Sequence, residues 1–127
     1  MNDTITLNIW GRELPIEVVY DCFENEEVDT IQKDTFEIFM AQHAAIFDSA
    51  YVMLEQYCAE KYPDLIPNKF DNIFKYIKPK TLYIKKSTTK RRIAGVLCNF
   101  KFDLDHGLAI YIDEGKVTKV GSQDIIL

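Results

Sequence analysis

The C-terminal segment, residues 103–127, is the part of the sequence that most constrains the fold. Within it, two runs of alternating apolar residues, 106–112 and 116–121, stand on either side of Glu114-Gly115. Alternation with a period of two is typical of a half-buried strand, and a short turn containing glycine joins two such strands into a hairpin. We therefore predict that the chain ends in an antiparallel β-hairpin.

Four more stretches also have the pattern of strands. Apolar and polar residues alternate from Thr4 to Trp10, and Gly11-Arg12 supplies a tight turn into a second strand that ends at Tyr20. Pro15 has no N–H to give to a neighbour, which favours the edge of a sheet for this second strand. Residues 81–86 and 92–102 are predicted to be two further strands, joined by the turn at 87–90 and continued by the C-terminal hairpin.

The middle of the chain is predicted to be helical. Residues 30–62 contain neither glycine nor proline, and Asp29 or Thr30 can cap a helix that starts there. A single helix of about 33 residues would be about 50 Å long, which exceeds the width of a compact domain of this size. We therefore expect a break near Gln42–Ala45 that divides the segment into two helices, with one continuous helix over residues 30–62 as the alternative. Asn68 is expected to cap a further short helix that ends at Ile77.

These elements together predict one α+β domain over residues 1–127. The N-terminal hairpin and the C-terminal meander would form an antiparallel sheet, and two or three helices would cover one of its faces. Met1 is followed by a short alternating run rather than by a basic stretch and an apolar block, and no window approaches the 20 or so apolar residues of a membrane span. Three widely spaced cysteines, Cys22, Cys58 and Cys98, indicate reduced thiols. A cytoplasmic location and no cofactor are expected.

Charge is distributed unevenly along the chain. Residues 1–63 carry 13 acidic and 3 basic side chains, whereas residues 64–127 carry 7 acidic and 12 basic ones. The acidic residues concentrate in the loop before the predicted helix, where a basic partner would find complementary charge that speeds association. The candidate partner-binding residues are Glu24, Glu26, Glu27 and Asp29. The structural alternative is a solvated loop that feeds negative charge into a helix N-terminus.

The sequence from residue 78 onward resembles that of a family of small, uncharacterised bacterial α+β proteins that share a domain of unknown function. The matching segments are Lys78–Ile84, Asp105–Ile110, Gly115–Val117, Val120-Gly121 and Gln123–Ile125. The resemblance implies a compact α+β domain with a protein-binding role, since some similar bacterial proteins are immunity partners of toxins. It implies no catalytic residues.

A chemical alternative rests on Asp103, Asp105 and His106, because two carboxylates and an imidazole can ligate a divalent metal or hold a water for hydrolysis. In an extended segment His106 would point away from both carboxylates, which weakens a three-ligand site. A turn in which aspartates accept backbone N–H bonds and Gly107 relieves a strained dihedral explains the same residues. His43, on the apolar stripe of the predicted helix, is expected to be a packing residue.

The basic cluster around the turn at 87–90 raises a third possibility, because phosphate binding requires clustered lysine and arginine. Its members are Lys85, Lys86, Lys90, Arg91 and Arg92. An overall charge of −5 and a pI of about 5.0 argue against a nucleic-acid partner. We therefore predict a non-enzymatic, cytoplasmic protein-interaction domain, with a basic toxin as a possible partner, and a metal-dependent hydrolase or small-ligand enzyme as the alternative.

Overall fold

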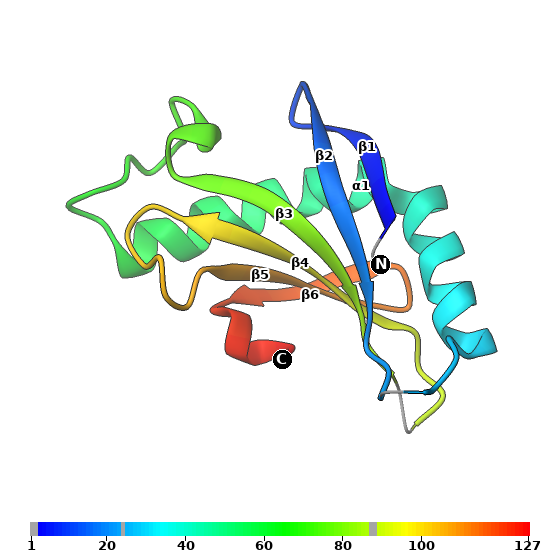
Figure 1. Cartoon of the computed structure of the whole chain (residues 1–127). Coiled ribbons are helices and arrows are strands. Elements are labelled where there is room, and N and C mark those ends of the chain that lie inside the picture. Colours follow the sequence, from blue (N-terminus) through cyan, green and yellow to red (C-terminus); the bar gives the residue numbers. More distant parts are fainter. Residues whose placement is uncertain (1–2, 24, 87–88) are drawn as a thin grey trace.

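A computed structural model describes residues 3–23, 25–86 and 89–127 of the chain (Figure 1). In this part of the chain, six strands form one sheet in sequence order, and one long helix and two short 3-10 helices accompany it. The elements are β1 (Asp3–Ile9), β2 (Arg12–Tyr20), α1 (Thr30–Lys61), η1 (Ile73–Lys75), β3 (Ile77–Ile84), β4 (Ile93–Phe100), β5 (Leu108–Asp113), β6 (Lys116–Gly121) and η2 (Gln123–Ile125).

Both predicted terminal hairpins are present. The β1–β2 turn uses Trp10-Gly11, with φ of 51° and 84°, and the β5–β6 turn uses Glu114-Gly115, with φ of 52° and 81°. Two consecutive residues with positive φ are the signature of a type I′ turn, whose twist matches that of the flanking strands. The N-terminal turn therefore lies one residue earlier than the Gly11-Arg12 position that the sequence suggested.

The prediction of an antiparallel sheet is wrong, because the sheet is mixed. β2 pairs with β3 in parallel, from Glu17 opposite Thr81 to Tyr20 opposite Ile84. The long helix carries the chain from the end of β2 back to the start of β3, as a parallel connection requires. β2 is thus an inner strand, but Pro15 precedes the part that pairs with β3, so its missing N–H costs no bond there.

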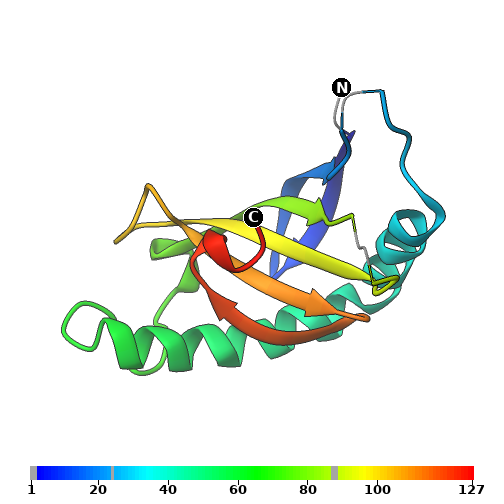
Figure 2. The same ribbon diagram turned by 90° about the horizontal axis from the view of Figure 1, so that it is seen from below.

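The prediction of two or three helices is also wrong. α1 runs without a break from Thr30 to Lys61, so no interruption occurs at Gln42–Ala45. At 1.5 Å per residue its 32 residues span about 48 Å, and Figure 2 shows it passing under the sheet and beyond its edge. The expected helix from Asn68 to Ile77 is a single 3-10 turn capped by Asn72, because Ile77 already pairs with Phe100 as the start of β3.

The main core lies between α1 and one face of the sheet. Its buried side chains include Phe39, Phe47 and Leu54 of the helix, and they pack against apolar residues from the strands. On the opposite face, η2 folds back so that Ile126 covers Gly95 (Figure 2). No helix among the described residues is long and apolar enough to cross a membrane.

The three cysteines are free, as predicted. Cys58 and Cys98 are buried, and burial raises the pKa of the Cys58 thiol to about 11 and that of Cys98 still further. Both thiols therefore stay protonated at neutral pH, and only Cys22 is partly accessible to solvent.

Candidate partner-binding surface

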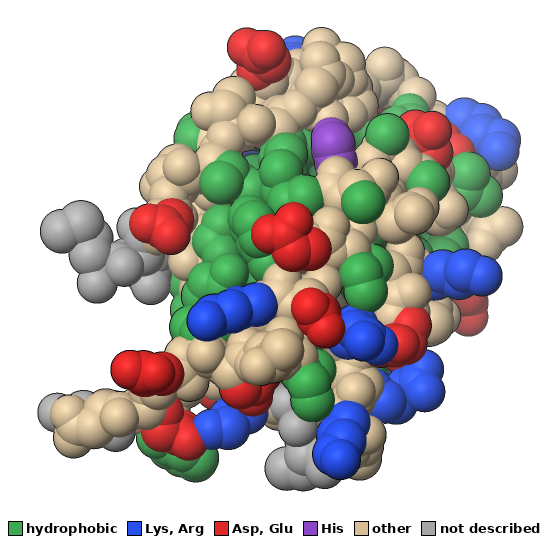
Figure 3. Space-filling model, turned by 90° about the vertical axis from the view of Figure 1, so that its right-hand side faces the viewer, with side chains coloured by type: hydrophobic (Ala, Val, Ile, Leu, Met, Phe, Trp, Pro, Cys, Tyr) green, Lys and Arg blue, Asp and Glu red, His purple; other side chains and the backbone are tan. Residues whose placement is uncertain are grey.

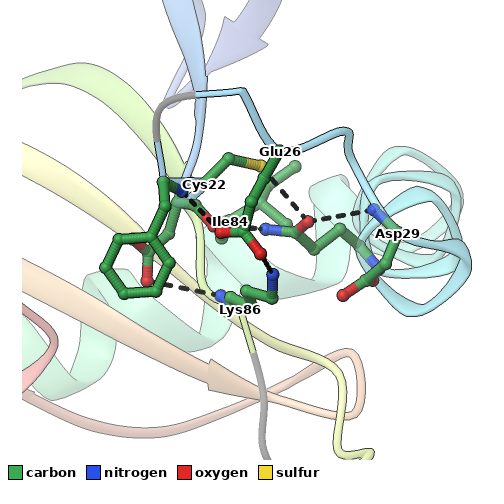
Figure 4. A network of polar contacts seen from close by, with 8 residues as sticks. Cys22, Glu26, Asp29, Ile84 and Lys86 are labelled. Atoms are coloured by element: carbon green, nitrogen blue, oxygen red, sulfur yellow. Dashed lines mark hydrogen bonds and ion pairs between the residues drawn. The ribbon is translucent and has the colours of Figure 1, made fainter.

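The acidic segment, residues 21–29, connects the end of β2 to the start of α1 and is anchored at its C-terminal end by a capping box. Asp29 is the N-cap residue, and its Oδ1 accepts a hydrogen bond of 2.7 Å from the backbone N–H of Gln32. In return, Gln32 Oε1 accepts one of 3.2 Å from the N–H of Asp29 (Figure 4). The two bonds satisfy donors that the first turn of a helix otherwise leaves unpaired. Asp29 is therefore a structural residue of the helix start.

Gln32 also joins the acidic segment to the sheet. Its side chain is fully buried, and Nε2 donates to the carbonyl oxygens of Asp21 at 2.9 Å and Ile84 at 3.3 Å. Oε1 also receives a contact of 3.6 Å from Cys22 Sγ (Figure 4). One amide thus links the ends of β2 and β3 with the first turn of α1, and it holds both ends of the segment in place.

A tight turn at the tip of the segment presents an aromatic side chain to solvent. The N–H of Glu26 donates to the carbonyl of Phe23 at 2.9 Å, and the N–H of Phe23 donates to Glu26 Oε1 at 2.7 Å. Asn25 takes the positive φ of 69° that the reversal requires. Phe23 is 78% exposed, so the turn presents most of its ring to solvent.

Glu26 forms an ion pair with Lys86, which follows β3 (Figure 4). The hydrogen bond from Lys86 lowers the pKa of the Glu26 carboxyl, and the backbone N–H of Phe23 lowers it further. The acidic segment therefore lies against Lys86, although 60 positions separate Glu26 from Lys86 in sequence. These segments are neighbours and partly neutralise each other.

Two further basic residues of the cluster, Arg91 and Arg92, also have acidic neighbours. Arg91 bonds to Asp113 at 2.6 Å, and Arg92 bonds to Glu114 at 3.0 Å, with Asp34 of α1 3.6 Å away. Lys85 Nζ donates to the carbonyl oxygen of Ile126 at 3.2 Å. These contacts give Lys85, Arg91 and Arg92 roles within the fold.

The four predicted partner-binding residues thus have different environments. Glu24 lies outside the described residues, Glu26 pairs with Lys86, Asp29 caps α1, and Glu27 is exposed. Sequence reasoning missed Phe23, although a lone phenylalanine among carboxylates is a signal that could have been noticed.

The alternative cluster forms a turn between β4 and β5. Asp103 Oδ1 accepts a hydrogen bond of 3.1 Å from the N–H of His106, and His106 Nδ1 lies 3.1 Å from both carboxylate oxygens of Asp103. Gly107, at φ 58°, donates its N–H to the carbonyl of Asp103 at 2.8 Å. Asp105 is exposed, and the described residues contain no group of three or more His, Cys, Asp or Glu that could hold a metal ion. The arrangement is that of a hydrogen-bonded turn.

We predict that His106 titrates above its usual pKa. The hydrogen bond and negative charge of Asp103 raise the pKa of the imidazole from 6.5, because both favour its charged form. The resulting stabilisation is fully present below pH 6.5 and is lost as the pH rises through the higher folded-state pKa. NMR titration of the wild type should show this raised pKa of His106, and in the Asp103→Asn variant the pKa of His106 should be lower. Equal pKa values of His106 in the two proteins would contradict the pairing.

The second histidine interacts with its own helix. His43 Nδ1 lies 2.8 Å from the carbonyl oxygen of Met40, one turn earlier in α1. His43 is partly buried, in agreement with its expected role as a packing residue.

Comparison with known protein families gives a match over the whole chain. The family described as "Domain of unknown function (DUF6985)" matches residues 1–127, which is the whole chain. No curated protein and no solved structure matches.

Proposed function

The chain belongs to the DUF6985 family of unknown function, and from that premise we propose that it is a non-enzymatic protein-interaction domain that binds a basic protein. The partner would contact the acidic segment, with Phe23 as the apolar anchor and Glu27 as the principal exposed charge. The observation that carries the proposal is the 78% exposure of Phe23 on a turn fixed by two hydrogen bonds.

Physical considerations support this location. Aromatic side chains are enriched at protein interfaces, where a few buried anchors provide most of the binding energy. An anchor on a pre-formed turn loses less conformational entropy on binding than one on a mobile loop. The Glu26–Lys86 ion pair, the two turn bonds and the Gln32 network supply such an arrangement here.

Among basic partners we propose a toxin, which this protein would neutralise as an immunity protein. The resemblance found in the sequence suggests this role, and an acidic surface is a physically reasonable means of capturing a cationic protein. The three free cysteines suit a reducing compartment such as the cytoplasm.

The first test is affinity capture from the cells that produce the protein, with wild type and a Phe23→Ala, Glu27→Lys double variant as baits. The expected partner is a basic protein enriched on wild type and depleted on the variant. Identical captures by the two baits would contradict the proposed surface.

Binding kinetics with that partner then separate the two residues. Glu27→Lys is expected to lower the association rate constant about threefold to tenfold at low salt, because charge complementarity steers the encounter. Phe23→Ala is expected to raise the dissociation rate constant about 30-fold, as loss of an anchor worth about 2 kcal/mol requires. Unchanged rate constants in both variants would exclude the acidic segment as the binding surface.

Glu60→Lys is the matched control for the charge change. Glu60 is also exposed, but it lies in the last turn of α1, at the opposite end of the helix from Glu27. The same change of two charge units there should leave the association rate within about twofold of wild type.

A further inference from the structure

The outer edge of β1 has open hydrogen-bonding positions. β1 pairs with β2, and it is the terminal strand of the sheet formed by the described residues. The type I′ turn makes its closing pair, Ile9 and Arg12, mutually hydrogen-bonded, and bonded and non-bonded pairs then alternate along the ladder. The N–H and C=O groups of Thr4, Thr6 and Asn8 therefore face away from β2. Three evenly spaced residues offer main-chain groups to a further strand.

This edge lacks the usual protection against pairing. β1, with the sequence DTITLNI, contains no proline, lysine or arginine, which are the residues that commonly blunt an exposed edge. The other edge of the sheet differs, since β6 carries Lys116 and Lys119 and packs against α1. The open edge is therefore confined to the β1 side.

Hydrophobic side chains lie beside the open edge. Ile5 of β1 and Phe36 and Met40 of α1 are partly buried against the main core and remain partly accessible. Figure 3, which faces β1 and the N-terminal half of α1, shows hydrophobic side chains gathered in a continuous strip on this side of the molecule. A strand added to β1 would place alternate side chains against this strip.

Carboxylates flank the same edge. Burial raises the pKa of Tyr20, at the end of β2, and the negative charges of Asp3 and Glu37 raise it further. Asp3, at the start of β1, and Glu37 of α1 therefore both lie in the neighbourhood of Tyr20. The acidic segment begins directly after Tyr20, and Asp3 pairs with Val18, so this edge continues the surface assigned to the partner.

We propose that the β1 edge binds an extended segment of the basic partner by strand addition, through the outward main-chain groups of Thr4, Thr6 and Asn8. The segment would place apolar side chains against Ile5 and the hydrophobic strip, and a basic side chain at its end near Asp3, which shares a face of β1 with Ile5. This inference rests on the proposed function. A second copy of the chain is a poorer occupant, because each copy carries a net charge of −5 and repels the other.

The test uses a blocked peptide of sequence Lys-Thr-Val-Thr-Val-Thr-Lys, in which the lysines lie on the same face as the valines, and a second peptide with glutamate in place of lysine. In NMR titrations of the full chain, the lysine peptide should shift the amide resonances of Thr4, Thr6 and Asn8, with a dissociation constant near the millimolar range. The glutamate peptide should bind at least fivefold more weakly.

Thr6→Pro removes one outward N–H and leaves the β1–β2 ladder intact, because position 6 belongs to a non-bonded pair. It should weaken binding of the lysine peptide at least tenfold, whereas Thr6→Ala, which keeps the N–H, should change it less than twofold. Glu37→Lys leaves the strand unaltered and should weaken binding about threefold at low salt. Thermal unfolding of each variant confirms that the fold is retained.

Three results would overturn the inference: shifts that map away from β1, equal affinities of Thr6→Pro and Thr6→Ala, or self-association of the chain that protects the same amides. The Phe23→Ala, Glu27→Lys double variant distinguishes failure of the β1-edge inference from failure of the proposed function. It should bind the lysine peptide as wild type does, because neither residue belongs to the β1 edge.

Discussion

Gln32→Ala is expected to lower the free energy of unfolding by about 3–4 kcal/mol, the largest effect of any polar substitution that we anticipate. The change removes both donors to the carbonyls of Asp21 and Ile84 and the acceptor for the N–H of Asp29. Because Gln32 is fully buried, water cannot readily replace these bonds. The acidic segment should also lose its fixed position relative to the sheet.

Urea denaturation monitored by far-UV circular dichroism measures this effect, with Gln42→Ala as the matched control. Gln42 lies on the same helix but is exposed, so the same substitution there should cost less than about 0.5 kcal/mol. Equal losses of stability in the two variants would show that Gln32 acts only through helix propensity and would contradict its linking role.

Gly107→Ala is expected to lower the free energy of unfolding by about 3 kcal/mol, through two separable causes. The first is the backbone φ of 58°, which disfavours any side chain with a Cβ. The second is space, because a Cβ at this position would lie 2.6 Å from the carbonyl oxygen of Cys98 and 2.5 Å from Gln123 Nε2. Gln123 can move, but the backbone of β4 cannot move without disturbing the sheet.

Gly11→Ala isolates the first cause. Gly11 has a φ of 84°, and a Cβ there would meet nothing within 4 Å. Its replacement should therefore cost only the dihedral penalty of about 1–2 kcal/mol. Thermal and urea unfolding measure the difference in stability between the Gly107→Ala and Gly11→Ala variants. If the two variants are equally stable, the contact with Cys98 carries no cost.

Local sequence patterns predicted the hairpins well and the connection between them poorly. A period of two with a glycine turn is a short-range signal, so both terminal hairpins were predicted correctly. The parallel pairing of β2 with β3 joins residues such as Tyr20 and Ile84, which are 64 positions apart, and no local pattern encodes it. The predicted number of helices was wrong because we assumed that no helix would be longer than the domain is wide, whereas α1 extends past the edge of the sheet.

In the candidate surface, too, local features could be predicted from the sequence and contacts between distant segments could not. Asp29 was recognised as a possible cap, because the residue preferences at a helix start are local in sequence. The pairing of Glu26 with Lys86 could not be predicted, since only the fold brings the two segments together. The charge asymmetry read from the sequence therefore overstated the acidity of the segment, and it gave no sign of the exposed Phe23.

Hydrogen–deuterium exchange of the protein alone and in complex with its captured partner tests the central claim most directly. If the partner covers the acidic segment, amides between Asp21 and Asp29 should exchange at least tenfold more slowly in the complex, and Glu60 and its neighbours should be unchanged. Protection confined to other elements, for example to the Asp103–His106 turn, with no change between Asp21 and Asp29, would contradict the assignment.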